Sequence, residues 1–226
     1  LVAFAEDADV ENVDAGNTVR AMTDLAREYS QVDALHRGLP DFPRSFTGKG
    51  VLIGVIDTGF DFMHPAFRDA EGNSRIIHVW DQSGRNGNTP SMGYGVVFDT
   101  PELIRSAAHD VSRDTHGTHV AAIAASSADV YKGMAPESDI VVVATDKSES
   151  GIIDALAYLL DYAEKEKKPM AINLSMGTVI GFKDGTDPIA SMIDELLDKS
   201  GKKCLMAIAA GNEGHRNSTI VTEAEG

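Results

Sequence analysis

The sequence is short of cysteine, of positive charge and of long apolar runs. Cys204 is the only cysteine among 226 residues, which excludes an internal disulfide and a cysteine-rich metal cluster. Lysine and arginine number 20 against 35 aspartates and glutamates, and the net charge of −15 argues against nucleic acid and anionic membranes as partners. No apolar run reaches the ~20 residues that a membrane-spanning helix needs. The remaining composition is that of a globular domain.

Signatures of several other chemistries are also missing. The first apolar run ends in Asp57-Thr58-Gly59 with no glycine-rich phosphate loop after it, which disfavours a nucleotide-binding protein. His116 and His119 are spaced i, i+3 near Asp114, without the glutamate and the i, i+4 spacing of a zinc-protease helix and without an apparent third ligand. Cys204 lies within an apolar run, which favours a small core residue over a nucleophile. We therefore predict no metal site from these residues.

Apolar runs alternate with amphipathic segments from about residue 49 onward. This alternation predicts an α/β fold in three layers, α/β/α, with a mainly parallel central sheet. Unbroken, β-branched runs are typical of strands covered on both faces, and such runs or similar strand patterns lie at 50–56, 75–81, 139–144, 169–177 and 203–210. Helices are expected at 101–108, 116–126, 151–168 and 189–197. Residues 1–48, which have only a weak helical spacing at 17–35, are interpreted as a surface-wrapping N-terminal extension.

Polar residues stand beside glycines where three of the expected strands end. They are Asp57, Ser175 close to Gly177, and Asn212. Because the carboxyl ends of parallel strands meet at one edge of a sheet, we expect these residues at the same edge, within reach of the helix that begins near His116. There an aspartate can accept the Nδ1–H of an imidazole, the imidazole can take a proton from a hydroxyl nucleophile, and an asparagine amide can donate to an oxyanion.

Four segments in order resemble the motifs of the subtilisin-like serine proteases. They are Ile53-Gly54-Val55-Ile56-Asp57-Thr58-Gly59 with His64-Pro65, His116-Gly117-Thr118-His119-Val120-Ala121, Asn173-Leu174-Ser175-Met176-Gly177, and Ala209-Ala210-Gly211-Asn212-Glu213-Gly214. The resemblance covers about residues 48–214. It implies a subtilisin-like fold and a serine endopeptidase that acts on protein or peptide substrates.

The same resemblance implies a role for each site residue. Asp57 is the acid of the triad, His116 the general base and Asn212 the oxyanion donor, while His119 is structural. Ser175, Met176 and Gly177 resemble the strand that pairs with the substrate backbone and walls the pocket for the residue before the scissile bond. The peptidase activity is expected to fall at acid pH, when His116 becomes protonated.

The nucleophile is where the sequence departs from the family. Subtilases carry their serine in a Gly-Thr-Ser motif followed by a helix, downstream of the oxyanion asparagine, and this sequence contains no Gly-Thr-Ser. Ser218 has neither the glycine turn nor a following helix, so it is not the expected nucleophile. We therefore expect a C-terminally incomplete peptidase domain that is inactive by itself, with its serine encoded elsewhere. The alternative is a non-catalytic binding module on the same scaffold.

The remaining expectations follow from the same resemblance. Residues 1–48 would be an extension, or the end of a pro-region or linker, and 49–226 the peptidase domain with an insertion at about 70–112. The resemblance implies a secreted or cell-envelope protein. The resemblance makes no cofactor certain and leaves calcium as the candidate, although no acidic loop here has a readable ligand spacing.

Overall fold

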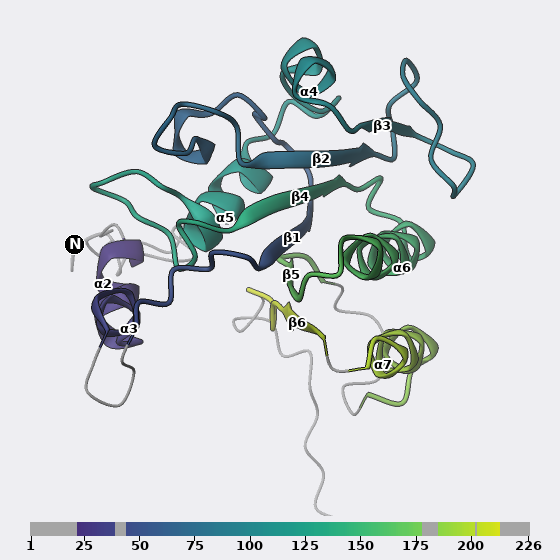
Figure 1. The fold of residues 1–226 in the computed structure, drawn as a ribbon. Helices are drawn as coiled ribbons and strands as arrows, with labels where there is room; N and C mark the ends of the chain where they lie inside the picture. The colour runs from purple at the N-terminus through teal and green to yellow at the C-terminus, as the bar shows by residue number, and fades with distance from the viewer. Residues whose placement is uncertain (1–21, 39–43, 178–184, 202, 213–226) are drawn as a thin grey trace, which may run out of the picture.

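The fold is built on a six-stranded sheet, seen in a computed structural model that describes residues 22–38, 44–177, 185–201 and 203–212 (Figure 1). The strands are β1 Leu52–Asp57, β2 Ile76–Asp81, β3 Val96–Phe98, β4 Asp139–Ala144, β5 Met170–Leu174 and β6 Cys204–Ile208. Their order in the sheet is β3-β2-β4-β1-β5-β6. Every neighbouring pair is parallel except β2–β3, so the mainly parallel sheet predicted from the sequence is confirmed.

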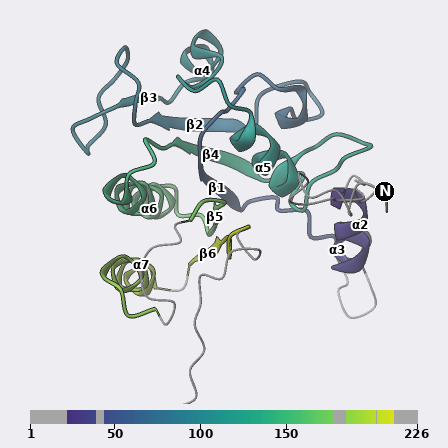
Figure 2. The ribbon, with the colours of Figure 1, turned by 180° about the vertical axis from the view of Figure 1, so that it is seen from behind.

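Helices cover both faces of this sheet. They are α2 Met22–Tyr29, α3 Val32–Arg37, α4 Pro101–Ala107, α5 His116–Ala125, α6 Glu149–Glu166 and α7 Pro188–Lys199, with a short 3-10 helix η1 at Pro65–Phe67. Because side chains alternate along a strand, β1 sends Leu52 and Ile56 into the core with α6 and α7. Its Ile53 and Val55 enter the core with α5 on the opposite face (Figure 1 and Figure 2). This is the predicted three-layer α/β/α arrangement.

The stretch between β1 and α5 contains the strand that the sequence does not predict. β3 has three residues and pairs antiparallel with β2, so it is too short to show a hydrophobic period. β2, in contrast, lies between β3 and β4, and its Val79 and Trp80 are fully buried. The segment at about 70–112, which we interpret as an insertion, thus contributes the strands β2 and β3 to the central sheet.

The N-terminal helices α2 and α3 dock at the far end of α5. The guanidinium of Arg27 donates to the carbonyl of Lys132 at 2.9 Å, and Nε2 of His36 lies 2.9 Å from the carbonyl of Met134. Both carbonyls belong to the loop that follows the C-terminal end of α5. With ten residues at a rise of 1.5 Å each, that end is ~15 Å from the N-terminal residue, His116. The described part of residues 1–48 thus contacts the domain well away from His116.

Strand β2 buries a histidine against α6. His78 is only 7% exposed, its Nε2 lies 2.7 Å from the hydroxyl of Tyr158, and its ring centroid is 4.5 Å from that of Tyr162. Burial lowers the pKa of His78 from its ordinary value of 6.5 to about 4. The folded protein therefore holds this imidazole neutral at a pH where an unfolded chain would protonate it.

We predict that His78→Phe weakens the loss of stability in acid. The pKa of His78 is lower in the folded state. Its neutral ring therefore contributes fully to the stability above pH 6.5, and this contribution is lost as the pH falls toward about 4. At pH 5 the wild type should lose about 2 kcal/mol of unfolding free energy through His78, and His78→Phe should not show this loss. Urea denaturation of both proteins at pH 7.5 and pH 5 measures the difference. The exposed His119, changed to Gln, is the control for the loss of a histidine outside the core. Equal slopes for wild type and His78→Phe would contradict the prediction.

Candidate active site

The site begins at the carboxyl end of the central strand β1. Asp57 is the last residue of β1, which lies between β4 and β5, and its side chain is fully buried. Its Oδ1 accepts the backbone amide of Thr58 at 2.7 Å. Neighbouring backbone groups thus hold the carboxylate at the edge of the sheet where the strands end.

His116 meets this carboxylate from the first turn of α5. Its Nδ1 lies 2.8 Å from Oδ1 and 3.0 Å from Oδ2 of Asp57. A carboxylate only accepts, so Nδ1 carries the hydrogen and Nε2 is left with its lone pair. The His116 side chain is 47% exposed, while that of Asp57 is fully enclosed. The pair therefore has a buried acid that orients an imidazole open to solvent.

The backbone ties the turn after β1 to the start of α5. No side-chain cap closes the helix at Thr115. Instead, the amide of Gly117 donates to the carbonyl of Thr58 at 2.8 Å, and the amide of Thr118 to the carbonyl of Gly59 at 3.0 Å. These bonds satisfy two of the amides that a helix N-terminus leaves without intrahelical partners. We call this set of contacts, made by Thr58, Gly59, Gly117 and Thr118, the β1–α5 clasp.

The side chain of Thr118 strengthens the clasp. Its Oγ1 donates to the carbonyl of Gly59 at 3.0 Å and accepts the amide of Asp61 at 2.7 Å. A threonine at this position thus holds the turn on both sides of Phe60. The sequence motif His116-Gly117-Thr118 contains this residue, but its position gave no sign that Thr118 binds a turn 59 residues earlier.

Two glycines allow the close approach of the two segments. Gly59 has φ +82, and a Cβ there would lie 2.5 Å from the carbonyl carbon of Asp114. A Cβ on Gly117 would lie 2.8 Å from the ring of Phe60. A side chain on Gly59 would collide with the backbone just before α5, and a side chain on Gly117 would require the buried ring of Phe60 to move. Packing therefore explains why glycines stand at positions 59 and 117, shortly after Asp57 and His116.

The loop before α5 contributes a further carboxylate. Oδ1 of Asp114 accepts the amide of Thr115 at 2.7 Å and that of His116 at 3.3 Å. These amide bonds are the main reason that the pKa of Asp114 is lowered. The acid stands at the N-terminus of α5, where a negative charge is favourable to the helix dipole.

The other predicted site residues lie at the ends of the next two strands. Ser175, Met176 and Gly177 follow β5 directly, and Asn212 comes shortly after β6. The sheet order β1-β5-β6, with all pairs parallel, puts them on the edge that carries Asp57. A Cβ on Gly177 would lie 3.9 Å from the carbonyl of Ala209, so the two strand ends run side by side. Ser218 lies outside the described residues.

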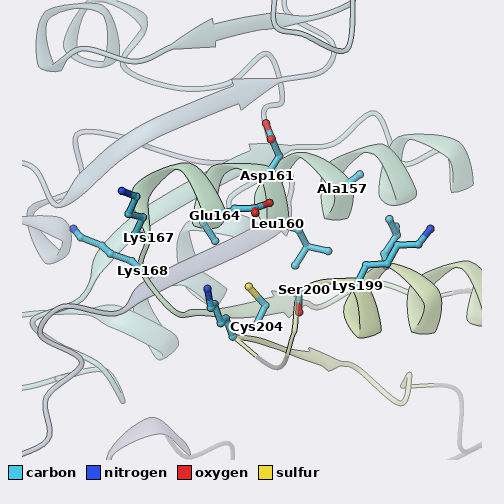
Figure 3. Close-up of a pocket in the computed structure, with 12 residues that line it drawn as sticks. Ala157, Leu160, Asp161, Glu164, Lys167, Lys168, Lys199, Ser200 and Cys204 are labelled. Carbon is cyan, nitrogen blue, oxygen red and sulfur yellow. The ribbon is translucent and has the colours of Figure 1, made fainter.

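A hollow of about 260 Å³ lies elsewhere, between α6 and α7 (Figure 3). Its apolar part includes Leu160 and Cys204, and lysines such as Lys167 and Lys199 stand around it. Cys204 is the first residue of β6, so the hollow lies at the amino ends of the strands, opposite Asp57. The lysines stand near the C-terminal ends of two helices, where positive charge is favourable. The hollow is therefore separate from the candidate site.

Cys204 and the acidic side chains outside the candidate site are further groups, among the described residues, of reactive or metal-binding types. Burial raises the pKa of the Cys204 thiol, which keeps it protonated and unreactive at neutral pH. Across the described parts of the chain, no group of three or more His, Cys, Asp or Glu side chains is arranged to hold a metal ion. None of the helices in the same parts is long and apolar enough to cross a membrane.

Comparison with known proteins identifies the family of this chain. The profile of Peptidase_S8, the Subtilase family, matches residues 48–225, and the chain therefore belongs to the subtilase family. The serine protease AprX of Bacillus subtilis (strain 168) is 27% identical over 97% of this chain. An intracellular serine protease of Paenibacillus polymyxa is 28% identical over 84% of it. The structure of the Clostridium perfringens CspB protease superposes with a TM-score of 0.60 at 32% identity over 75% of this chain.

The chain spans about half or less of these relatives. It covers 45% of AprX, 52% of the intracellular serine protease and 38% of the CspB chain. The family and the fold that the sequence motifs predicted are thus confirmed, and the two relatives from Bacillus subtilis and Paenibacillus polymyxa are serine proteases. One of them is intracellular, so secretion stays a prediction.

We predict that Gly59→Ala destabilises the protein far more than Gly72→Ala. Both glycines have φ near +85, but a Cβ on Gly72 meets nothing within 4 Å, whereas on Gly59 it collides with the Asp114 backbone. Gly72→Ala should cost about 1 kcal/mol of unfolding free energy for the left-handed backbone, and Gly59→Ala about 2 kcal/mol more. Urea denaturation of the two variants measures the difference. Equal losses would show that the approach of α5 to β1 is not tight.

Proposed function

We propose that this chain supplies the acid, the base and an oxyanion donor of a serine endopeptidase whose nucleophilic serine lies outside it. The observation that carries the proposal is the hydrogen bond from Nδ1 of His116 to the buried carboxylate of Asp57. The family membership agrees with it. A histidine that served only the fold would have no need of an exposed ring held by a buried acid.

The proposed chemistry uses both nitrogens of the imidazole. Asp57 fixes the Nδ1–H tautomer, so Nε2 can accept the proton of a serine hydroxyl while the serine oxygen attacks the carbonyl carbon of a peptide bond. His116 then carries a positive charge, which the adjacent Asp57 carboxylate stabilises. The same proton passes to the leaving amine when the peptide C–N bond breaks. Asp57 itself needs to transfer no proton.

Asn212 and the end of β5 complete the proposed substrate site. The amide NH2 of Asn212 would donate to the oxyanion that forms when the serine attacks. Ser175, Met176 and Gly177 would pair with the backbone of a protein or peptide substrate, because an extended peptide can join the end of a strand through main-chain hydrogen bonds. Their position at the sheet edge that carries Asp57 supports both assignments.

An uncovered part of the sheet supports a serine supplied by another segment. On the α5 side of β5 and β6, Ala171 pairs with Leu205 and Asn173 with Ala207. Leu205 is 75% exposed, and Ala171 and Ala207 are exposed as well. Apolar sheet faces are normally buried by a packed helix or loop. We propose that the segment bearing the serine covers this face in the complete protease.

A second candidate is a binding module that has lost its chemistry. The observation in its favour is the absence of Gly-Thr-Ser from the sequence. For both candidates we propose that the protein is exported from the cell or held in the cell envelope. Fractionation of the producing cells would test this localisation. The two candidates differ in whether a reactive serine joins this chain.

We predict that a serine-directed fluorophosphonate does not label this chain by itself. The same chain, produced with the residues that follow it in its reading frame, should be labelled at one serine, and His116→Ala should abolish that labelling because the hydroxyl loses its base. Labelling is measured by intact-mass spectrometry, with His119→Ala as the matched control that keeps it. Labelling of the chain alone at Ser218 would contradict the proposal. A longer protein that takes no label would favour the binding module.

A further inference from the structure

Asp110 is a buried carboxylate that the proposed chemistry does not use. It is 3% exposed and stands in the loop between α4 and α5. Its Oδ2 accepts the amide of Gly59 at 2.7 Å, and its own amide donates to the carbonyl of Phe60 at 3.2 Å. Its Oδ1 accepts the amide of Ser112 at 3.2 Å, which fixes the carboxylate within its own loop. One residue thus holds both residues of the turn after Thr58.

The turn that Asp110 holds is the β1 side of the clasp. The amide of Gly59 binds Asp110, while the carbonyl of Gly59 accepts both the amide and the hydroxyl of Thr118 in α5. Gly59 has no side chain of its own to fix its peptide planes, and it sits at a positive φ. The orientation of its two peptide groups therefore depends on Asp110 at one end and α5 at the other.

Burying this carboxylate costs free energy that no cation offsets. Asp110 has no ion-pair partner in the described ranges, and the charged group that faces it is a second buried carboxylate, Asp81. Asp81 is also 3% exposed, and it accepts the amides of Ser83 and Gly84 at 3.0 Å and that of Val111 at 3.3 Å. Burial raises the pKa of both carboxyl groups, and the charge of Asp81 raises that of Asp110 further. An unpaired buried charge is a poor way to gain stability alone.

We propose that Asp110 is a positioning residue for the Asp57–His116 pair, which it aligns by holding the amide of Gly59. The inference rests on the proposed function, since it treats these two residues as the working acid and base. Asp110 touches neither of them and acts through the clasp. Its charge makes the bond to Gly59 stronger and more directional than a neutral acceptor would.

The test compares Asp110→Asn with Asp81→Asn in this chain. Each change removes one buried carboxylate from the same region. Both oxygens of each carboxylate accept backbone amides, and an asparagine has only one acceptor oxygen, so its NH2 group must face an amide that it cannot bind. The readout is the chemical shift of the His116 Nδ1–H proton by NMR at neutral pH, which reports the hydrogen bond to Asp57, and Asp57→Asn defines the full effect of a lost carboxylate. We expect Asp110→Asn to move this resonance by about half of that full effect or more, because a misaligned carboxylate accepts a weaker hydrogen bond. Asp81→Asn should move it only slightly.

Equal changes of the His116 Nδ1–H resonance in Asp110→Asn and Asp81→Asn would overturn the inference, since loss of a nearby charge would then explain both. If Asp110→Asn does not fold, the unsubstituted chain gives the answer. Its Gly59 amide resonance should follow the acid titration of the Asp110 carboxyl, and a Gly59 amide that ignores this titration would refute the contact. Neither readout needs turnover. The inference about Asp110 can therefore be tested even if this chain has no peptidase activity. A negative result for Asp110 is distinct from a negative result for the proposed peptidase function.

Discussion

The Asp57–His116 pair depends on the backbone hydrogen bonds that join the turn after β1 to the first turn of α5. Gly117 and Thr118 donate to the carbonyls of Thr58 and Gly59, and these bonds take the place of an N-terminal side-chain cap. Asp57 precedes one end of this contact and His116 the other. The distance between the acid and the base is therefore set by main-chain geometry, with little freedom left to either side chain.

The candidate site residues lie at one edge of the sheet, and the other notable features lie elsewhere. Asp57, the residues after β5 and Asn212 all follow the carboxyl ends of parallel strands, which is where open α/β sheets place their sites. The α2–α3 contacts lie at the other end of α5, and the hollow beside Cys204 lies at the amino ends of the strands. On the α5 side of β5 and β6, apolar side chains such as that of Leu205 are exposed, and no described helix packs on them.

The sequence predicts most strands and the Asp57–His116 pair because both are indicated by short local patterns. β1, β4 and β6 are dense apolar runs, and Asp57 and His116 stand in short motifs beside glycines. It does not predict β3, whose three residues carry no period. The sequence also does not reveal the proposed role of Asp110. An aspartate two residues before Ser112 indicates a local turn, but the hydrogen bond between Asp110 and Gly59 joins residues 51 positions apart. Contacts of that kind depend on the folded sheet and on no nearby residue.

The central claim is that Asp57 orients His116 for catalysis, and kinetics of Asp57→Asn test it most directly. The variant keeps the size of the side chain but offers an amide that can hold the imidazole in the wrong tautomer. For a complete protease that contains this chain, we predict that kcat for peptide hydrolysis at neutral pH falls about 10⁴-fold, with the fold unchanged by circular dichroism. A kcat within about tenfold of wild type, well short of the loss expected for a misoriented base, would contradict the account.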